Sequence, residues 1–86
     1  MHMNKWYFYI ARCQDESLYI GITHDADKRI KRHNQGDGAK WIKQHGNAEI
    51  VYTEMYDNYM EAHHREIQVK KWSRKKKDNL INGLKP

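Results

Sequence analysis

Residues 5–22 read KWYFYIARCQDESLYIGI, and this stretch decides the fold class. Residues 5–12 are rich in aromatic side chains, which favour an extended strand, and residues 18–22 form a second short apolar run. Residues 14–17 between them are all polar and suit a turn. Two strands separated by so short a break predict an antiparallel hairpin.

A helix is predicted directly after the hairpin, over residues 25–35. Thr23 or Asp25 can cap its start, and Gly36 supplies the left-handed residue that commonly ends a helix. Residues 39–44 predict a further short helical turn. This region therefore separates the hairpin from the next strand by helical structure.

The rest of the chain predicts one more strand and two more helices. Residues 49–56 alternate well enough to form a third strand, and residues 60–72 have helical periodicity. Ser73 can cap a last helix, which ends near Gly83. The order β-β-α-(α)-β-α-α predicts an α+β fold, a three-stranded antiparallel sheet flanked by helices.

The chain length and charge distribution set limits on the class of protein. Eighty-six residues allow a single domain over residues 1–86, since there is no room for two cores. The formal net charge is +5, and residues 1–58 contribute none of it because their eight basic and eight acidic residues cancel. Residues 59–86 carry all the excess, which suggests a polyanionic partner; the alternative is a solvated helical face.

The single cysteine, Cys13, excludes an internal disulfide and suits a reducing compartment. No apolar run approaches the roughly 20 residues of a membrane span, and the first residues lack the apolar region of a signal peptide. We therefore expect a cytoplasmic protein without a membrane partner. Zinc is not expected, because the candidate ligands lack paired spacing: Cys13, His45, His63 and His64.

Arg29 and His33 form the first unusual feature of the predicted helices. Ala26 and Ile30 should face the sheet, which leaves Arg29 and His33 flanking the buried stripe near the hairpin. An arginine there is costly unless it meets an anion. A surface arginine with a buried stem is the alternative explanation.

Glu66 is the second unusual feature. Ala62, Val69 and Trp72 make an apolar stripe at helical spacing, and Glu66 lies within it. A carboxylate that faces the core needs a cation. Two partners remain open at this stage: a salt bridge, for example to Arg29 or Lys70, or a metal ion.

An ordered set of residues resembles the motifs of the GIY-YIG nuclease superfamily: Tyr9, then Tyr19-Ile20-Gly21, Arg29 and Glu66. The likeness is greatest to its small stand-alone bacterial members and runs from Tyr7 to Ile81. Its motifs here are Tyr7-Phe8-Tyr9-Ile10, Leu18-Tyr19-Ile20-Gly21-Ile22-Thr23, Lys28-Arg29, His33-Asn34, Gly36-x-Gly38-Ala39-Lys40 and Arg65-Glu66-x-x-Val69-Lys70-Lys71-Trp72. The chain departs from the family in lacking the Gly and Ile of the first motif, and in having Trp41-Ile42 where Tyr-Thr is usual.

The resemblance implies a metal-dependent endonuclease and a role for each site residue. Tyr9 would be the general base and Tyr19 would assist it or replace it; a free tyrosine has a pKa of about 10, so a neighbouring cation must stabilise its anion. Arg29 would bind the scissile phosphate, because a planar guanidinium matches it better than a lysine does. Glu66 would hold one Mg²⁺ or Mn²⁺ ion. His33 would polarise Tyr9 or bind phosphate.

The implied substrate is nucleic acid, and we expect DNA rather than RNA, in repair or processing. A monomer is expected, with sequence specificity low or supplied by a targeting protein. The residues expected to contact nucleic acid are Lys40, Lys70, Lys71, Arg74, Lys75, Lys76 and Lys77. One alternative is a catalytically inactive nucleic-acid-binding module of the same fold. Another is a protein-interaction module that uses exposed aromatic residues.

Overall fold

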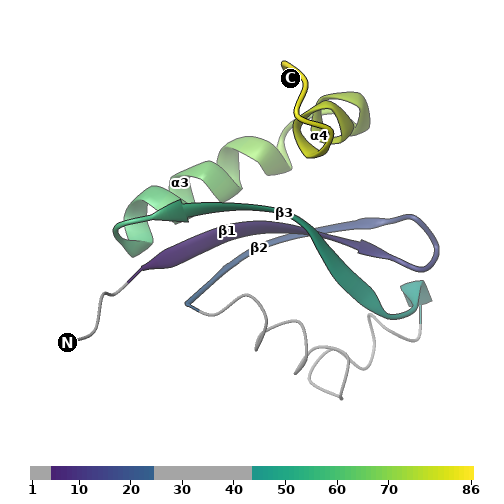
Figure 1. Ribbon diagram of the computed structural model, residues 1–86, viewed down its shortest axis with the longest axis horizontal. Coiled ribbons are helices and arrows are strands. Elements are labelled where there is room, and N and C mark those ends of the chain that lie inside the picture. Colours follow the sequence, from purple (N-terminus) through teal and green to yellow (C-terminus); the bar gives the residue numbers. More distant parts are fainter. Residues whose placement is uncertain (1–4, 25–43) are drawn as a thin grey trace.

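The computed structural model describes residues 5–24 and 44–86. Its strands are β1 (Trp6–Cys13), β2 (Leu18–Thr23) and β3 (Ala48–Tyr56), and its helices are α3 (Tyr59–Lys70) and α4 (Arg74–Ile81) (Figure 1). The strands form one antiparallel sheet in the order β2-β1-β3. The predicted α+β fold with a three-stranded antiparallel sheet is confirmed.

The hairpin between β1 and β2 has the predicted polar turn. The backbone N–H of Cys13 donates to the carbonyl of Ser17 at 2.9 Å, and that of Glu16 donates to the carbonyl of Cys13 at 2.9 Å. Glu16 has a φ of 71°, in the left-handed region. The Asp15 carboxylate accepts from both the backbone and the hydroxyl of Ser17, which fixes the turn locally.

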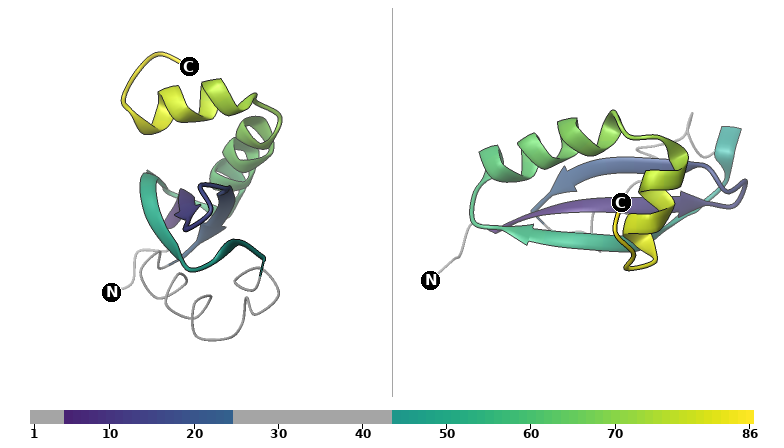
Figure 2. Two further views of the ribbon diagram at one scale, coloured as in Figure 1. Left: turned by 90° about the vertical axis from the view of Figure 1, so that its right-hand side faces the viewer. Right: turned by 90° about the horizontal axis from the view of Figure 1, so that it is seen from above.

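The two faces of the sheet carry different clusters, because successive side chains of a strand point to opposite sides. Both helices lie on one face (Figures 1 and 2). The core on that face comprises Phe8, Ile10, Ile20, Val69 and Leu80. The opposite face carries a second cluster of Tyr9, Ala11, Cys13 and Ala48, with Tyr19 and Ile50 packed against it.

The two helices begin at side-chain caps. Asn58 accepts the backbone N–H of Glu61 at 3.0 Å, so α3 starts one residue before the predicted position. It ends at Lys70 rather than Trp72. Ser73 caps α4 as predicted, accepting the backbone N–H of Lys76 at 3.3 Å. The predicted helix 25–35, and the turn 39–44 except for its last residue, lie outside the described residues.

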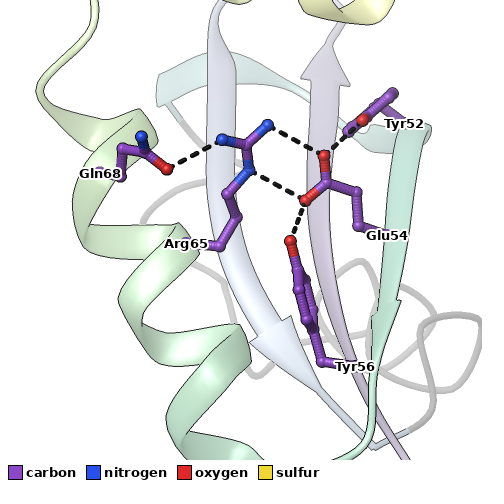
Figure 3. A network of polar contacts seen from close by, with 5 residues as sticks. All are labelled: Tyr52, Glu54, Tyr56, Arg65 and Gln68. Atoms are coloured by element: carbon purple, nitrogen blue, oxygen red, sulfur yellow. Dashed lines mark hydrogen bonds and ion pairs between the residues drawn. The ribbon is translucent and has the colours of Figure 1, made fainter.

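A half-buried polar network fixes α3 against β3 (Figure 3). Arg65 on α3 donates to both carboxylate oxygens of Glu54 on β3, at 2.9 and 3.1 Å, and to Gln68 at 2.9 Å. The hydroxyls of Tyr52 and Tyr56 donate to the same carboxylate. Burial tends to raise the pKa of Glu54, but these hydrogen bonds outweigh it and lower that pKa. Burial and the bond to Glu54 raise the pKa of each tyrosine to about 12.

Candidate active site

Tyr9 lies in the middle of β1, opposite Gly21 on β2 and Thr53 on β3. Only 2% of the residue is exposed. A Cβ atom added at Gly21 would lie 2.8 Å from the Tyr9 hydroxyl oxygen, closer than two such atoms can approach. Gly21 therefore leaves the space that the phenol ring occupies, which gives a physical reason for glycine after Tyr19-Ile20.

Tyr19 lies beside Tyr9, packed against the cluster on the face of the sheet opposite the helices. Its ring stacks on that of Tyr9, with centroids 6.2 Å apart and planes at 27°. Tyr19 belongs to β2, which forms one edge of the sheet. It also lines a shallow pocket together with residues of β2, α3 and α4: Leu18, Ile20, Glu66, Lys70 and Lys77.

Glu66 is the acidic group of this pocket. It lies between the fully buried residues Ala62 and Val69 of α3, and its side chain is 14% exposed. Lys70 Nζ is 3.0 Å from one carboxylate oxygen and His63 Nδ1 is 3.1 Å from the other. The prediction of a carboxylate on the core-facing stripe of this helix is therefore confirmed.

Of the two partners left open for Glu66, the salt bridge to Lys70 is present. The Lys70 side chain is 55% exposed, so this cation is solvated and loses little if it moves away from the carboxylate. The other suggested salt-bridge partner, Arg29, lies outside the described residues. The ion pair therefore balances the negative charge of the Glu66 carboxylate with a lysine that stays exposed to water.

Glu66 supplies the one carboxylate among the described residues that line this pocket, so it is the group there that could hold a metal ion. Among residues 5–24 and 44–86 there is no group of three or more His, Cys, Asp or Glu side chains that could enclose a metal. Mg²⁺ commonly takes one or two carboxylates and completes its shell with water and substrate phosphate. Glu66 lines the pocket, and the side chain of its lysine partner is more than half exposed.

The basic residues of the C-terminal region separate into groups with different surroundings. Lys77 is half-buried and lines the Glu66 pocket beside Lys70. Lys76 lies over the ring of Trp72, with Nζ 4.8 Å from its centroid, and Arg74 is paired with Asp78 at 3.0 Å. Lys71 and Lys75 are exposed. Three predicted site residues lie outside the described part of the chain: Arg29, His33 and Lys40.

Two features near Glu66 were not predicted from the sequence. His63 precedes Glu66 by three residues, a spacing that brings side chains together on a helix and that could have indicated the contact. Lys77 reaches the pocket from a different helix, and no spacing along the chain would have indicated it. In the part of the chain that the structure describes, no helix is long and apolar enough to cross a membrane.

The chain is similar in sequence and fold to several known proteins. The GIY-YIG catalytic domain matches residues 5–79. A UPF0213 protein of Staphylococcus saprophyticus is 48% identical over 80 residues, which cover 93% of this chain and 98% of that protein. A UPF0213 protein of Clostridium perfringens is 47% identical over 77 residues, which cover 90% of this chain and 83% of that protein. The solution NMR structure of the UPF0213 protein BH0048 from Bacillus halodurans has a TM-score of 0.59 to this chain. The two sequences are 41% identical, and the match covers 91% of this chain and 83% of that one.

Proposed function

The chain belongs to the GIY-YIG catalytic domain family, and we propose that it is a metal-dependent endonuclease acting on nucleic acid, DNA rather than RNA. The family itself indicates a nuclease. The substrate, the metal and a role in DNA repair or processing are our proposals. They rest on the geometry of the pocket and on the charge of residues 59–86.

The observation that carries the proposal concerns Tyr19, which is adjacent both to Tyr9 and to the pocket of Glu66. Its ring stacks on that of Tyr9, and the same residue lines the pocket that contains the Glu66 carboxylate. A nuclease of this type needs a phenol to move a proton and a carboxylate to hold a cation within one site. Here three separate elements, β1, β2 and α3, supply those groups.

In the proposed reaction Tyr9 acts as general base and takes a proton from the water that attacks phosphorus. Its burial and its fit over Gly21 hold the hydroxyl in one place, as positioned proton transfer requires. Tyr19 assists by its position beside Tyr9, or serves as the base itself. Arg29 is assigned to the scissile phosphate from the sequence motif, with His33 beside it.

Glu66 would hold one Mg²⁺ or Mn²⁺ ion, which when bound supplies positive charge to stabilise the departing oxygen. Lys70 would leave the carboxylate as the cation binds, and its ammonium group would then be available to a phosphate. Lys77 lines the same pocket and is the second phosphate partner that we assign. The remaining basic residues would hold the flanking substrate by non-specific attraction.

A cleavage assay with matched variants tests the proposal. Labelled single-stranded, duplex and branched substrates are incubated with the protein, with and without Mg²⁺ or Mn²⁺. Glu66→Gln should abolish metal-dependent cleavage, whereas Glu61→Gln, an exposed acid on the first turn of the same helix, should not. Metal-dependent cleavage by Glu66→Gln at the wild-type rate would show that the assignment of Glu66 is wrong.

A second candidate function is binding of nucleic acid without cleavage. The ion pair between Lys70 and Glu66 favours it, because a carboxylate already compensated by a lysine needs no metal. Salt-sensitive binding without cleavage of any substrate, in either metal, would identify this function.

A further inference from the structure

Four side chains of α3 form a continuous stripe beside the pocket. Tyr59, His63, Glu66 and Lys70 are spaced by four, three and four residues, so they lie one after another along one side of the helix. The stripe spans eleven residue steps, or about 16 Å of helix. It contains rings at one end, the Glu66 carboxylate next, and an ammonium group at the other end.

The ring end of the stripe is supported by other aromatic groups. The Tyr59 ring stacks on His63, with centroids 5.4 Å apart and planes at 20°. Trp6, from the start of β1, meets Tyr59 in a T-shaped contact with ring centroids 5.0 Å apart, and the ring centroid of His24, after β2, lies 3.7 Å from that of Trp6. The start of α3 and the start of β1 lie beside each other at the same end of the sheet (Figure 1).

These rings remain accessible although they are ordered by their neighbours. Tyr59 is 45% exposed and the His63 side chain 38%. An aromatic group that faces water while another ring holds it in place offers a flat surface at little additional entropic cost. His63 is in contact with Glu66, so this surface adjoins the proposed cleavage site directly.

The other end of the stripe is suited to phosphates. Lys70 and Lys77 line the pocket beyond Glu66, and residues 59–86 carry the whole net charge of the chain. The stripe therefore has aromatic rings on one side of the carboxylate and the Lys70 ammonium group on the other, where Lys77 of α4 also lines the pocket. A strand of nucleic acid has the matching parts, flat bases and phosphates, along one chain.

We propose that Tyr59 and His63 form a binding site for unpaired bases, which makes single-stranded nucleic acid the preferred substrate. Base faces stack on exposed aromatic rings only where they are not already stacked within a duplex, while a basic groove follows the backbone. A strand lying along α3 would place bases on the rings and phosphates toward Lys70 and Lys77. The phosphodiester between them would then lie at Glu66. The inference rests on the proposed function for the location of cleavage, but base binding does not require cleavage.

Binding measured without metal tests the inference separately from catalysis. Fluorescence anisotropy in EDTA compares a labelled oligothymidylate with a duplex of equal length, for the wild-type chain and three variants. Tyr59→Leu removes the ring, Tyr59→Phe keeps it, and Ile67→Ala removes another exposed side chain of the same helix. We expect tighter binding of the single strand, weakened about 5- to 50-fold by Tyr59→Leu and changed less than about twofold by the two controls.

A second readout reports stacking itself. A single strand that contains 2-aminopurine loses fluorescence when that base stacks, so the wild type and Tyr59→Phe should quench it and Tyr59→Leu should not. Circular dichroism of each variant verifies that α3 is intact. Equal binding of single strand by Tyr59→Leu and wild type, or tighter wild-type binding of the duplex, would overturn the inference.

The two proposals fail in different ways. If the wild type cleaves nothing in either metal but binds the single strand through Tyr59, the proposed function is wrong and the base site stands. If the wild type cleaves with Mg²⁺ while Tyr59→Leu binds single strands as tightly as wild type, the proposed function stands and the base site is wrong.

Discussion

Glu54 and Glu66 are two carboxylates of similar burial, and we predict opposite outcomes when each is changed to glutamine. Their side chains are 20% and 14% exposed. Glu54 accepts two hydrogen bonds from Arg65, itself only 21% exposed, and one from each of two tyrosines. Glu66 is paired instead with the half-exposed side chains of Lys70 and His63.

The magnitudes follow from what each substitution leaves behind. Glu54→Gln strands a half-buried guanidinium and should cost about 2–4 kcal/mol, because the buried cation loses its charge partner. Glu66→Gln leaves a lysine that water can solvate, so its cost should stay below about 1 kcal/mol. In a domain of this size about 1 kcal/mol corresponds to roughly 4–8 °C in Tm.

Thermal unfolding with and without Mg²⁺, combined with a cleavage assay, measures both effects. Glu66→Gln should keep a Tm within about 8 °C of wild type but lose cleavage. Mg²⁺ should raise the Tm of the wild type, by an amount equivalent to about 1.4 kcal/mol at ten times its Kd, and should not raise that of Glu66→Gln. Glu54→Gln should unfold at a far lower temperature, and its remaining folded fraction should still respond to Mg²⁺.

One result would refute the reasoning about Glu66. A Glu66→Gln protein that is destabilised by several kcal/mol and still cleaves with Mg²⁺ would show that this carboxylate is a structural ion-pair partner. An unchanged Tm for Glu54→Gln would equally refute the role given to the network between β3 and α3.

The other predictions concern the base, the phosphate contact, the basic segment and pH. Tyr9→Phe should fold and bind substrate but lose turnover by about 10²–10⁴-fold; normal cleavage by it, with loss in Tyr19→Phe, would reverse the assignment of the base. Arg29→Ala should lower turnover by roughly 10²–10³-fold, and full rescue by Arg29→Lys would reduce Arg29 to a non-specific contact. Alanine at residues 75–77 should weaken binding and flatten its salt dependence, whereas an unchanged salt slope would mean that these lysines only solvate a helix. Because the pKa of Glu54 is lowered in the folded protein, its ion pair stabilises the fold fully above its ordinary pKa of about 4.5, and this stabilisation is lost as the pH falls through the pKa of the folded state. Acid unfolding of the wild type and of Glu54→Gln measures this loss.

Local patterns in the sequence were sufficient to predict the described elements and the fold class. The aromatic and apolar runs around a polar turn identified the hairpin, because strand preference and turn preference act over a few residues. Ser73 indicated the start of α4, since a cap needs only its own side chain and the next turn. The 3.6-residue period also placed Glu66 on the core-facing stripe of α3, where it lies.

Partner choice was decided only by the tertiary structure. The sequence suggested Arg29 or Lys70 for Glu66, and it contained no indication that Arg65 pairs with Glu54 or that Trp6 supports Tyr59. Lys77 of α4 lines the pocket together with residues of β2 and α3, whereas Lys75 and Lys76 of the same helix do not. Periodicity fixes the direction of a side chain relative to the axis of its own helix or strand. Which group it meets depends on how elements distant in sequence pack together, and that is set by the shape of the whole core.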